Sequence, residues 1–154
     1  MTLALSMGRR GMGRTWPNPS VGCVVVKDNQ IVGAGTTADG GRPHAEVVAL
    51  SQAGAKAHGA TAYVTLEPCV HTGKSPPCTE ALIKSGVARV VAAVGDPDPR
   101  VNGKGFRALK AAGVEVVTGV MAGQAACDHR GYFLKNSQYR PFLTLKIATS
   151  FDGR

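Results

Sequence analysis

A histidine, a glutamate and two cysteines are spaced so that together they can bind and use a metal ion. His44 and Glu46 are two positions apart, and Cys69 and Cys78 follow later in the chain, each directly after a proline. One imidazole and two thiolates suit Zn²⁺, and a catalytic zinc site has three protein ligands and keeps a fourth position for water. We therefore predict a zinc site formed by His44, Cys69 and Cys78.

Glu46 is suited to proton transfer at this site. It falls on the first turn of the helix expected from His44 onward, so it can lie near the metal without binding it. The order H-x-E followed by P-C and a further Cys is the known pattern of zinc-dependent nucleobase deaminases, except that Cys69 and Cys78 are nine positions apart here. We predict Glu46 as the catalytic base that activates the attacking water and as the acid that protonates the departing ammonia.

Other interpretations of these residues stay open at this point. Taken alone, the two cysteines could be core residues or a disulfide. A zinc-dependent deaminase acting on nucleosides, nucleobases or tRNA would use the same ligands, with a shorter loop between the cysteines. A non-catalytic zinc-binding module for nucleic acid would need four protein ligands, and we find three in register.

The elements that must position these residues alternate between strands and helices. Each predicted zinc ligand falls at a junction between a strand and a helix, which favours an α/β fold: a three-layer α/β/α sandwich with a mixed central sheet of about five strands. Expected helices span residues 2–12, 44–56, 79–85, 105–112 and 121–136, and expected strands span residues 21–26, 31–35, 62–66, 87–94, 114–118 and 141–147.

Composition narrows the class of protein. The 154 residues are 44% hydrophobic and 18% charged, which excludes a disordered chain, and no apolar run is long enough for a membrane helix. With 4 Cys and no signal peptide pattern, we expect a cytoplasmic protein and no disulfide framework. The net charge of +8 favours a phosphorylated partner, and an aromatic content of 5% argues against a base-stacking surface for nucleic acid.

Several longer segments carry a family resemblance. They resemble the deaminase domain of the bifunctional riboflavin-biosynthesis deaminase-reductase, a member of the cytidine-deaminase-like superfamily, and they are residues 17–22, 44–46, 67–78, 96–99 and 140–142. The resemblance implies a zinc hydrolase that converts 2,5-diamino-6-ribosylamino-4(3H)-pyrimidinone 5′-phosphate into 5-amino-6-ribosylaminouracil 5′-phosphate. In that family a second, NADPH-dependent domain reduces the ribose. We therefore expect a deaminase domain over residues 1–140, the truncated first segment of a reductase over residues 141–154, and no reductase activity.

The resemblance also implies substrate-binding residues around the metal. These are Asn18, held between two prolines, His71 and Lys74 on the loop between the zinc cysteines, and Asp96 and Asp98 after a strand. The residues agree with this, because Lys is a suitable partner for phosphate and an Asn amide can contact a pyrimidine edge. The chain departs from the family at Asp98, where Asn is frequent, and at Thr36-Thr37, where a Trp-His pair is common.

The partners expected from these features are few. We expect a phosphorylated pyrimidine ribotide as substrate, no membrane and no nucleic acid, and assembly of the chain into a homo-oligomer, a dimer or larger.

Overall fold

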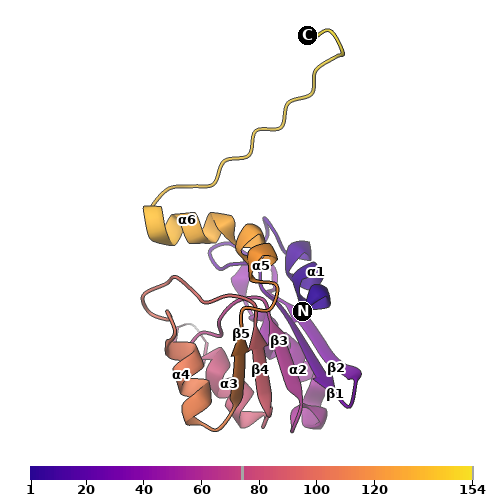
Figure 1. The fold of residues 1–154 in the computed structure, drawn as a ribbon, viewed down its shortest axis with the longest axis vertical. Helices are drawn as coiled ribbons and strands as arrows, with labels where there is room; N and C mark the ends of the chain where they lie inside the picture. Colours follow the sequence, from indigo (N-terminus) through magenta and orange to yellow (C-terminus); the bar gives the residue numbers. More distant parts are fainter. Residues whose placement is uncertain (74, 154) are drawn as a thin grey trace.

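The computed structural model describes residues 1–73 and 75–153 and contains a five-stranded mixed sheet (Figure 1). The strands lie in the order β2-β1-β3-β4-β5. β1 runs antiparallel to both β2 and β3, whereas β3, β4 and β5 are parallel. Their bounds are β1 (Gly22–Lys27), β2 (Gln30–Thr36), β3 (Thr61–Val64), β4 (Arg89–Ala92) and β5 (Glu115–Thr118).

Helices cover both faces of this sheet. On one side α2, α3 and α4 contact one another in series, and on the other side α1 contacts α5, which contacts α6. The helices are α1 (Thr2–Arg10), α2 (Ala45–Ala53), α3 (Cys78–Lys84), α4 (Lys104–Ala111), α5 (Ala122–Asp128) and α6 (Arg130–Gln138), and short 3₁₀ turns span Asp39–Gly41 and Gly54–Ala57. The predicted three-layer α/β/α fold with five strands is confirmed.

Glycines allow two of the helices to approach the strands closely. A Cβ at Gly22 in β1 would lie 1.8 Å from the carbonyl oxygen of Ala4 in α1, and a Cβ at Gly33 in β2 would lie 2.1 Å from that of Ala49 in α2. No side chain fits in either place, so these helices rest directly on the backbone of the sheet. Between the layers, the core is built from small and branched apolar side chains, including Val25, Val64, Leu82, Val90 and Leu109.

The parallel strands direct two loops to one edge of the sheet. β3 and β4 end at neighbouring positions, Val64 beside Ala92, so the segments that follow them leave the sheet side by side. In Figure 1 α6 lies across this edge, above the ends of the strands. Ligands of open α/β sheets bind at the carboxyl ends of parallel strands, and this edge is therefore where a site is expected.

Two expectations about the C-terminal part were wrong. The helix predicted over residues 121–136 is divided at His129 into α5 and α6. The strand predicted over residues 141–147 does not form, because this segment extends away from the body with no neighbouring strand to supply hydrogen bonds (Figure 1). One contact holds its start, where the guanidinium of Arg130 lies 4.0 Å from the centre of the Phe142 ring. No helix within the described part of the chain is both long and apolar enough to cross a membrane.

Candidate active site

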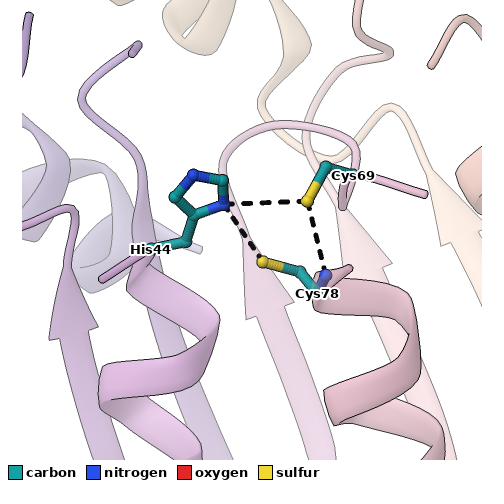
Figure 2. A group of neighbouring side chains, drawn as sticks. All are labelled: His44, Cys69 and Cys78. Atoms are coloured by element: carbon teal, nitrogen blue, oxygen red, sulfur yellow. Dashed lines mark hydrogen bonds between the residues drawn. The ribbon is translucent and has the colours of Figure 1, made fainter. Parts of the chain in front are cut away.

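His44, Cys69 and Cys78 come together in the fold although they are distant in sequence. Their ligand atoms all lie within 4.8 Å of one another. Figure 2 shows the imidazole facing both sulfurs, with Nδ1 of His44 3.2 Å from Sγ of Cys78 and 3.7 Å from Sγ of Cys69. A tetrahedral zinc site, with Zn–N of about 2.1 Å and Zn–S of about 2.3 Å, places N and S about 3.6 Å apart. The donor set and its spacing therefore fit zinc.

Local structure explains how the three ligands meet. His44 is the N-cap of α2, Cys69 lies on the loop after β3, and Cys78 is the first residue of α3. The backbone N–H of Cys78 donates to Sγ of Cys69 at 3.3 Å. Cysteines in the described part of the chain are free thiols, so the disulfide that the spacing alone allowed is not formed.

The two sulfurs differ in acidity. The hydrogen bond from Cys78 lowers the pKa of Cys69 to about 4, and the hydrogen bond with Cys69 raises the pKa of Cys78. The hydrogen bond with Cys69 also raises the pKa of the His44 imidazole. The cluster thus shares protons around a negative sulfur, and a divalent cation binds such a set by displacing those protons.

Glu46 lies on the first turn of α2 and is 4% exposed. Burial, together with the negative charge on Cys69, raises its pKa to about 7. A general acid–base group works best when its pKa is close to the operating pH, because it must both accept and release a proton. Its position in the fold and its acidity therefore suit proton transfer beside the metal cluster.

A cavity of about 300 Å³ opens beside the metal-ligand candidates His44 and Cys69. This volume is at the lower end of the range for small-molecule sites. His44, Glu46 and Cys69 form part of its wall, and Asn18, His71, Asp96 and Asp98 line it as well. The structure thus brings together these residues, which the sequence analysis selected, around one space. Lys74, selected with them, lies outside the described residues.

Asn18 contacts His44, one of the three metal-ligand candidates, directly. Its side-chain nitrogen donates to the carbonyl oxygen of Gly41 at 2.8 Å and lies 3.3 Å from Nε2 of His44. It thereby connects the segment before β1 with the segment that leads into α2. The Thr36-Thr37 departure is accommodated nearby: the hydroxyl of Thr37 accepts a hydrogen bond from the backbone N–H of Val21 at 3.0 Å and the residue is 2% exposed.

Asp96 and Asp98 follow β4 and have different partners. The hydroxyl of Tyr132 in α6 donates to the carboxylate of Asp96 at 2.9 and 3.2 Å. Burial raises the pKa of Asp96 to about 6, whereas hydrogen bonds from Arg100 lower the pKa of Asp98. The Asp96 carboxylate also accepts a 2.8 Å hydrogen bond from the backbone N–H of Asp98, which fixes the turn between them.

His71 carries a buried polar atom with no partner. Its Nδ1 makes no hydrogen bond within the described part of the chain, although the atom is shielded from solvent. The loop on which it lies is tied to the segment before α2, because the guanidinium of Arg42 donates to the hydroxyl of Ser75. An unsatisfied nitrogen in the wall of a cavity is costly unless a ligand satisfies it, so this atom is available to a substrate.

The role of Glu67 was not predicted from the sequence. This carboxylate is 3% exposed, and it accepts hydrogen bonds from the backbone N–H groups of Asp96, Gly103, Gly105 and Phe106 at 2.9 to 3.3 Å. It therefore holds the loop after β4 and the start of α4 against the strand end that leads to Cys69. An acidic residue at the end of a buried strand was the available signal, because a buried carboxylate needs partners.

The fold and the metal cluster define a class of protein. Residues 1–94 match the family described as the cytidine and deoxycytidylate deaminase zinc-binding region, and this match covers more than half of the chain. The chain belongs to this family.

Relatives and solved structures place the chain more narrowly. It is 53% identical over its whole length to the riboflavin biosynthesis protein RibD of Aquifex aeolicus and spans 43% of that protein. It is 50% identical over 133 residues to the diaminohydroxyphosphoribosylamino-pyrimidine deaminase of Buchnera aphidicola, covering 86% of this chain and 90% of that one. The structure of Acinetobacter baumannii RibD superposes with a TM-score of 0.92 at 52% identity, covering 99% of this chain and 43% of the other. The chain thus spans less than half the length of the RibD proteins that it matches.

Proposed function

We propose that this chain catalyses the hydrolytic deamination of 2,5-diamino-6-ribosylamino-4(3H)-pyrimidinone 5′-phosphate, a step of riboflavin biosynthesis. The observation that carries the proposal is the cluster of His44, Cys69 and Cys78 with the buried carboxylate of Glu46 beside it. The Buchnera relative, which is named as a deaminase of this pyrimidine and is covered almost completely by the match, supports the choice of substrate.

His44, Cys69 and Cys78 would hold the zinc ion, because they supply one imidazole and two sulfurs at the spacing of a tetrahedral site. When bound, zinc supplies Lewis acidity, which makes water a competent nucleophile at neutral pH. Among the described residues three side chains would hold the ion, which would leave a coordination position for the reactants, whereas a purely structural site would have a fourth protein ligand. This favours an enzyme over a zinc-binding module for nucleic acid.

Glu46 moves the protons of the reaction. It takes a proton from the attacking water while a C–O bond forms at the ring carbon that bears the amine, and it delivers that proton to the adjacent ring nitrogen. It then takes the proton of the newly added hydroxyl and transfers it to the amine as the C–N bond breaks and the carbonyl forms, so that ammonia leaves and the pyrimidinone becomes a uracil. A pKa of about 7 suits both halves of this exchange.

The remaining residues of the cavity wall bind and orient the ribotide. Asn18 is placed beside His44 to contact the pyrimidine edge, and Asp96 faces the same space with its carboxylate fixed by Tyr132. His71 offers its unpaired Nδ1 to the ribose phosphate, and Lys74 is proposed for the phosphate with it. The homo-oligomer and the domain division at residue 140 stay predictions.

The experiment that tests this function compares substrates on one preparation. Purified protein, with its zinc content measured, is offered the diaminopyrimidine ribotide and cytidine in parallel while ammonia release is followed. We expect release from the ribotide and little from cytidine, and loss of activity after chelation with recovery on adding zinc. Release from cytidine alone, or activity that survives complete removal of the metal, would contradict the proposal.

A further inference from the structure

Charged side chains of both signs form the wall of the cavity, and its cationic members are Arg42, Arg100 and Lys135. Among the described residues, four acidic side chains line it, and they are Glu46, Glu67, Asp96 and Asp98. An anionic substrate must enter against these carboxylates, and the repulsion between like charges is strong where solvent is excluded. A cation that is fixed in the wall would reduce this repulsion.

Arg100 is such a cation, and it is held by Asp98. Nε of the guanidinium lies 3.0 and 3.1 Å from the two oxygens of Asp98, Nη2 donates to the same carboxylate, and the backbone N–H of Arg100 adds a bond of 2.9 Å. The side chain of Asp98 is 8% exposed while that of Arg100 is 68% exposed. The carboxylate is thus the buried anchor, and the guanidinium is the part that solvent and ligands can reach.

The geometry of this pair leaves Arg100 able to bind a second anion. Its Nη1 has no hydrogen-bond partner within the described part of the chain, and Arg100 lines the same cavity as His44 and Glu46. His71, whose Nδ1 is unpaired within the described part of the chain, lines the same cavity as Asp98 and Arg100. A guanidinium fixed by a carboxylate is preorganised, and its planar donors match the oxygens of a phosphate.

We propose that Arg100, positioned by Asp98, binds the phosphate group of the substrate. This inference rests on the proposed function and deepens it, because it assigns the 5′-phosphate to the side of the cavity formed by the loop after β4. Asp98 then acts through Arg100 and is a positioning residue. Its carboxylate, which the sequence analysis assigned to substrate binding, is occupied by the guanidinium.

Kinetics with two substrates test this assignment. Arg100→Gln should raise KM for the ribotide at least about tenfold, since a hydrogen bond to a charged group is worth about 1.5 kcal/mol or more. The same variant should change KM for the dephosphorylated ribonucleoside less than about twofold. The value of kcat should be nearly unchanged for both, because the phosphate lies away from the reacting carbon.

Arg89→Gln is the matched control. Arg89 also pairs with a carboxylate, Glu115, at 2.8 Å, but it lies at the opposite end of β4 and does not line the cavity. The charge change is identical, so this control removes any general effect of net charge. We expect its KM to equal that of the unmodified protein for both substrates.

The double variant Asp98→Asn with Arg100→Gln separates phosphate binding from simple neutralisation of Asp98. If Arg100 binds phosphate, the raised KM persists in the double variant. A KM restored by Asp98→Asn would overturn the inference, and so would an equal loss with both substrates or an unchanged KM in Arg100→Gln.

Direct binding of ribose 5-phosphate, measured by calorimetry, tests Arg100 independently of turnover. Weaker binding by Arg100→Gln than by Arg89→Gln supports the inference even if the unmodified protein releases no ammonia, in which case the proposed function alone fails. Equal affinities of these two variants would refute the role of Arg100.

Discussion

The two sides of the cavity are built in different ways. On the metal side, His44 and Cys78 stand at the first turns of α2 and α3, so regular elements position them. On the opposite side, Asp96, Asp98 and Arg100 lie on the irregular segment after β4. Hydrogen bonds must fix such a segment, since it has no repeating backbone pattern of its own. The spacing of residues along the sequence therefore determines the metal side. The opposite side depends on contacts between residues that are far apart in the sequence.

Glu67 and α6 provide those contacts. Glu67 binds four backbone N–H groups of the segment after β4 and of α4, and Tyr132 of α6 binds Asp96. α6 is itself held where His129 is buried with its Nε2 3.3 Å from the hydroxyl of Thr65. Variants of the three metal ligands should therefore abolish metal binding, and variants on the opposite side should weaken stability and substrate binding while the metal stays.

The largest effect is expected for Cys69→Ser. A hydroxyl is a poor replacement for a thiolate, and loss of a ligand should lower metal affinity by more than about 100-fold, the upper range for loss of a supporting residue around a metal. Metal content after dialysis measures this. Cys127→Ser is the matched control, because Cys127 is an exposed free cysteine that does not belong to the group of metal ligands. A Cys69→Ser protein with full zinc content would show that Cys69 is not a ligand.

The next effect concerns pH and His129. Burial lowers its pKa to about 4 from an ordinary value of 6.5. The stability linked to this group is therefore present above pH 6.5 and is lost as the pH falls toward 4, by about 3 kcal/mol in total. His129→Asn has no imidazole to protonate and should not lose this stability. Between pH 7 and pH 4, the free energy of unfolding of the variant should therefore rise by about 3 kcal/mol relative to that of the unmodified protein.

Taking the difference between two proteins removes contributions that both share, including Asp96, whose raised pKa of about 6 acts in the opposite direction. Its stabilising contribution is fully present below pH 3.8 and is lost as the pH rises through 6. His58→Asn, the same substitution at an exposed histidine, is the matched control. A flat difference for His129→Asn would refute the buried, neutral state of this residue.

A smaller effect is expected for Glu67→Gln. The amide keeps the size of the side chain but turns one acceptor into a donor that faces backbone N–H groups, which should lower the free energy of unfolding by about 1–3 kcal/mol. Zinc content should be unchanged, whereas KM for the ribotide should rise because the loop with Asp96 and Arg100 loosens. Chemical denaturation and steady-state kinetics measure both quantities.

Glu80→Gln is the matched control for Glu67→Gln, because Glu80 is exposed and pairs with Lys84 on the surface of α3. It should leave stability within about 0.5 kcal/mol of the unmodified protein. If Glu67→Gln were equally neutral, the claim that Glu67 holds the second side of the cavity would be wrong.

Much of the fold and the metal side could be predicted from sequence. Apolar runs predicted β1, β3 and β4. Between β1 and β2 the chain turns at Asp28-Asn29, residue types that tolerate the positive φ values of 49° and 59° that they adopt. The ligands were recognisable from residue type and order. These features are local, and local patterns are what a sequence displays directly.

The opposite side of the cavity and the C-terminal part of the fold depend on contacts that cannot be predicted from residue types. The hydrogen-bond donors to Glu67 are backbone N–H groups, which every non-proline residue has, and Tyr132 is 36 positions from Asp96. The break between α5 and α6 falls at His129, which follows Asp128 and is not marked by a proline. There the imidazole is buried, with its Nε2 3.3 Å from the hydroxyl of Thr65. The segment over residues 141–147 has the alternation of a strand, but a strand forms only beside a partner.

The most direct test of the account is Glu46→Gln, studied for metal content and ammonia release together. The account predicts a protein that retains zinc and loses at least about 100-fold in kcat with the diaminopyrimidine ribotide, because a positioned general acid–base group typically contributes this much or more. Turnover close to that of the unmodified protein, with zinc in place, would contradict the assignment of Glu46 as the proton carrier beside His44, Cys69 and Cys78.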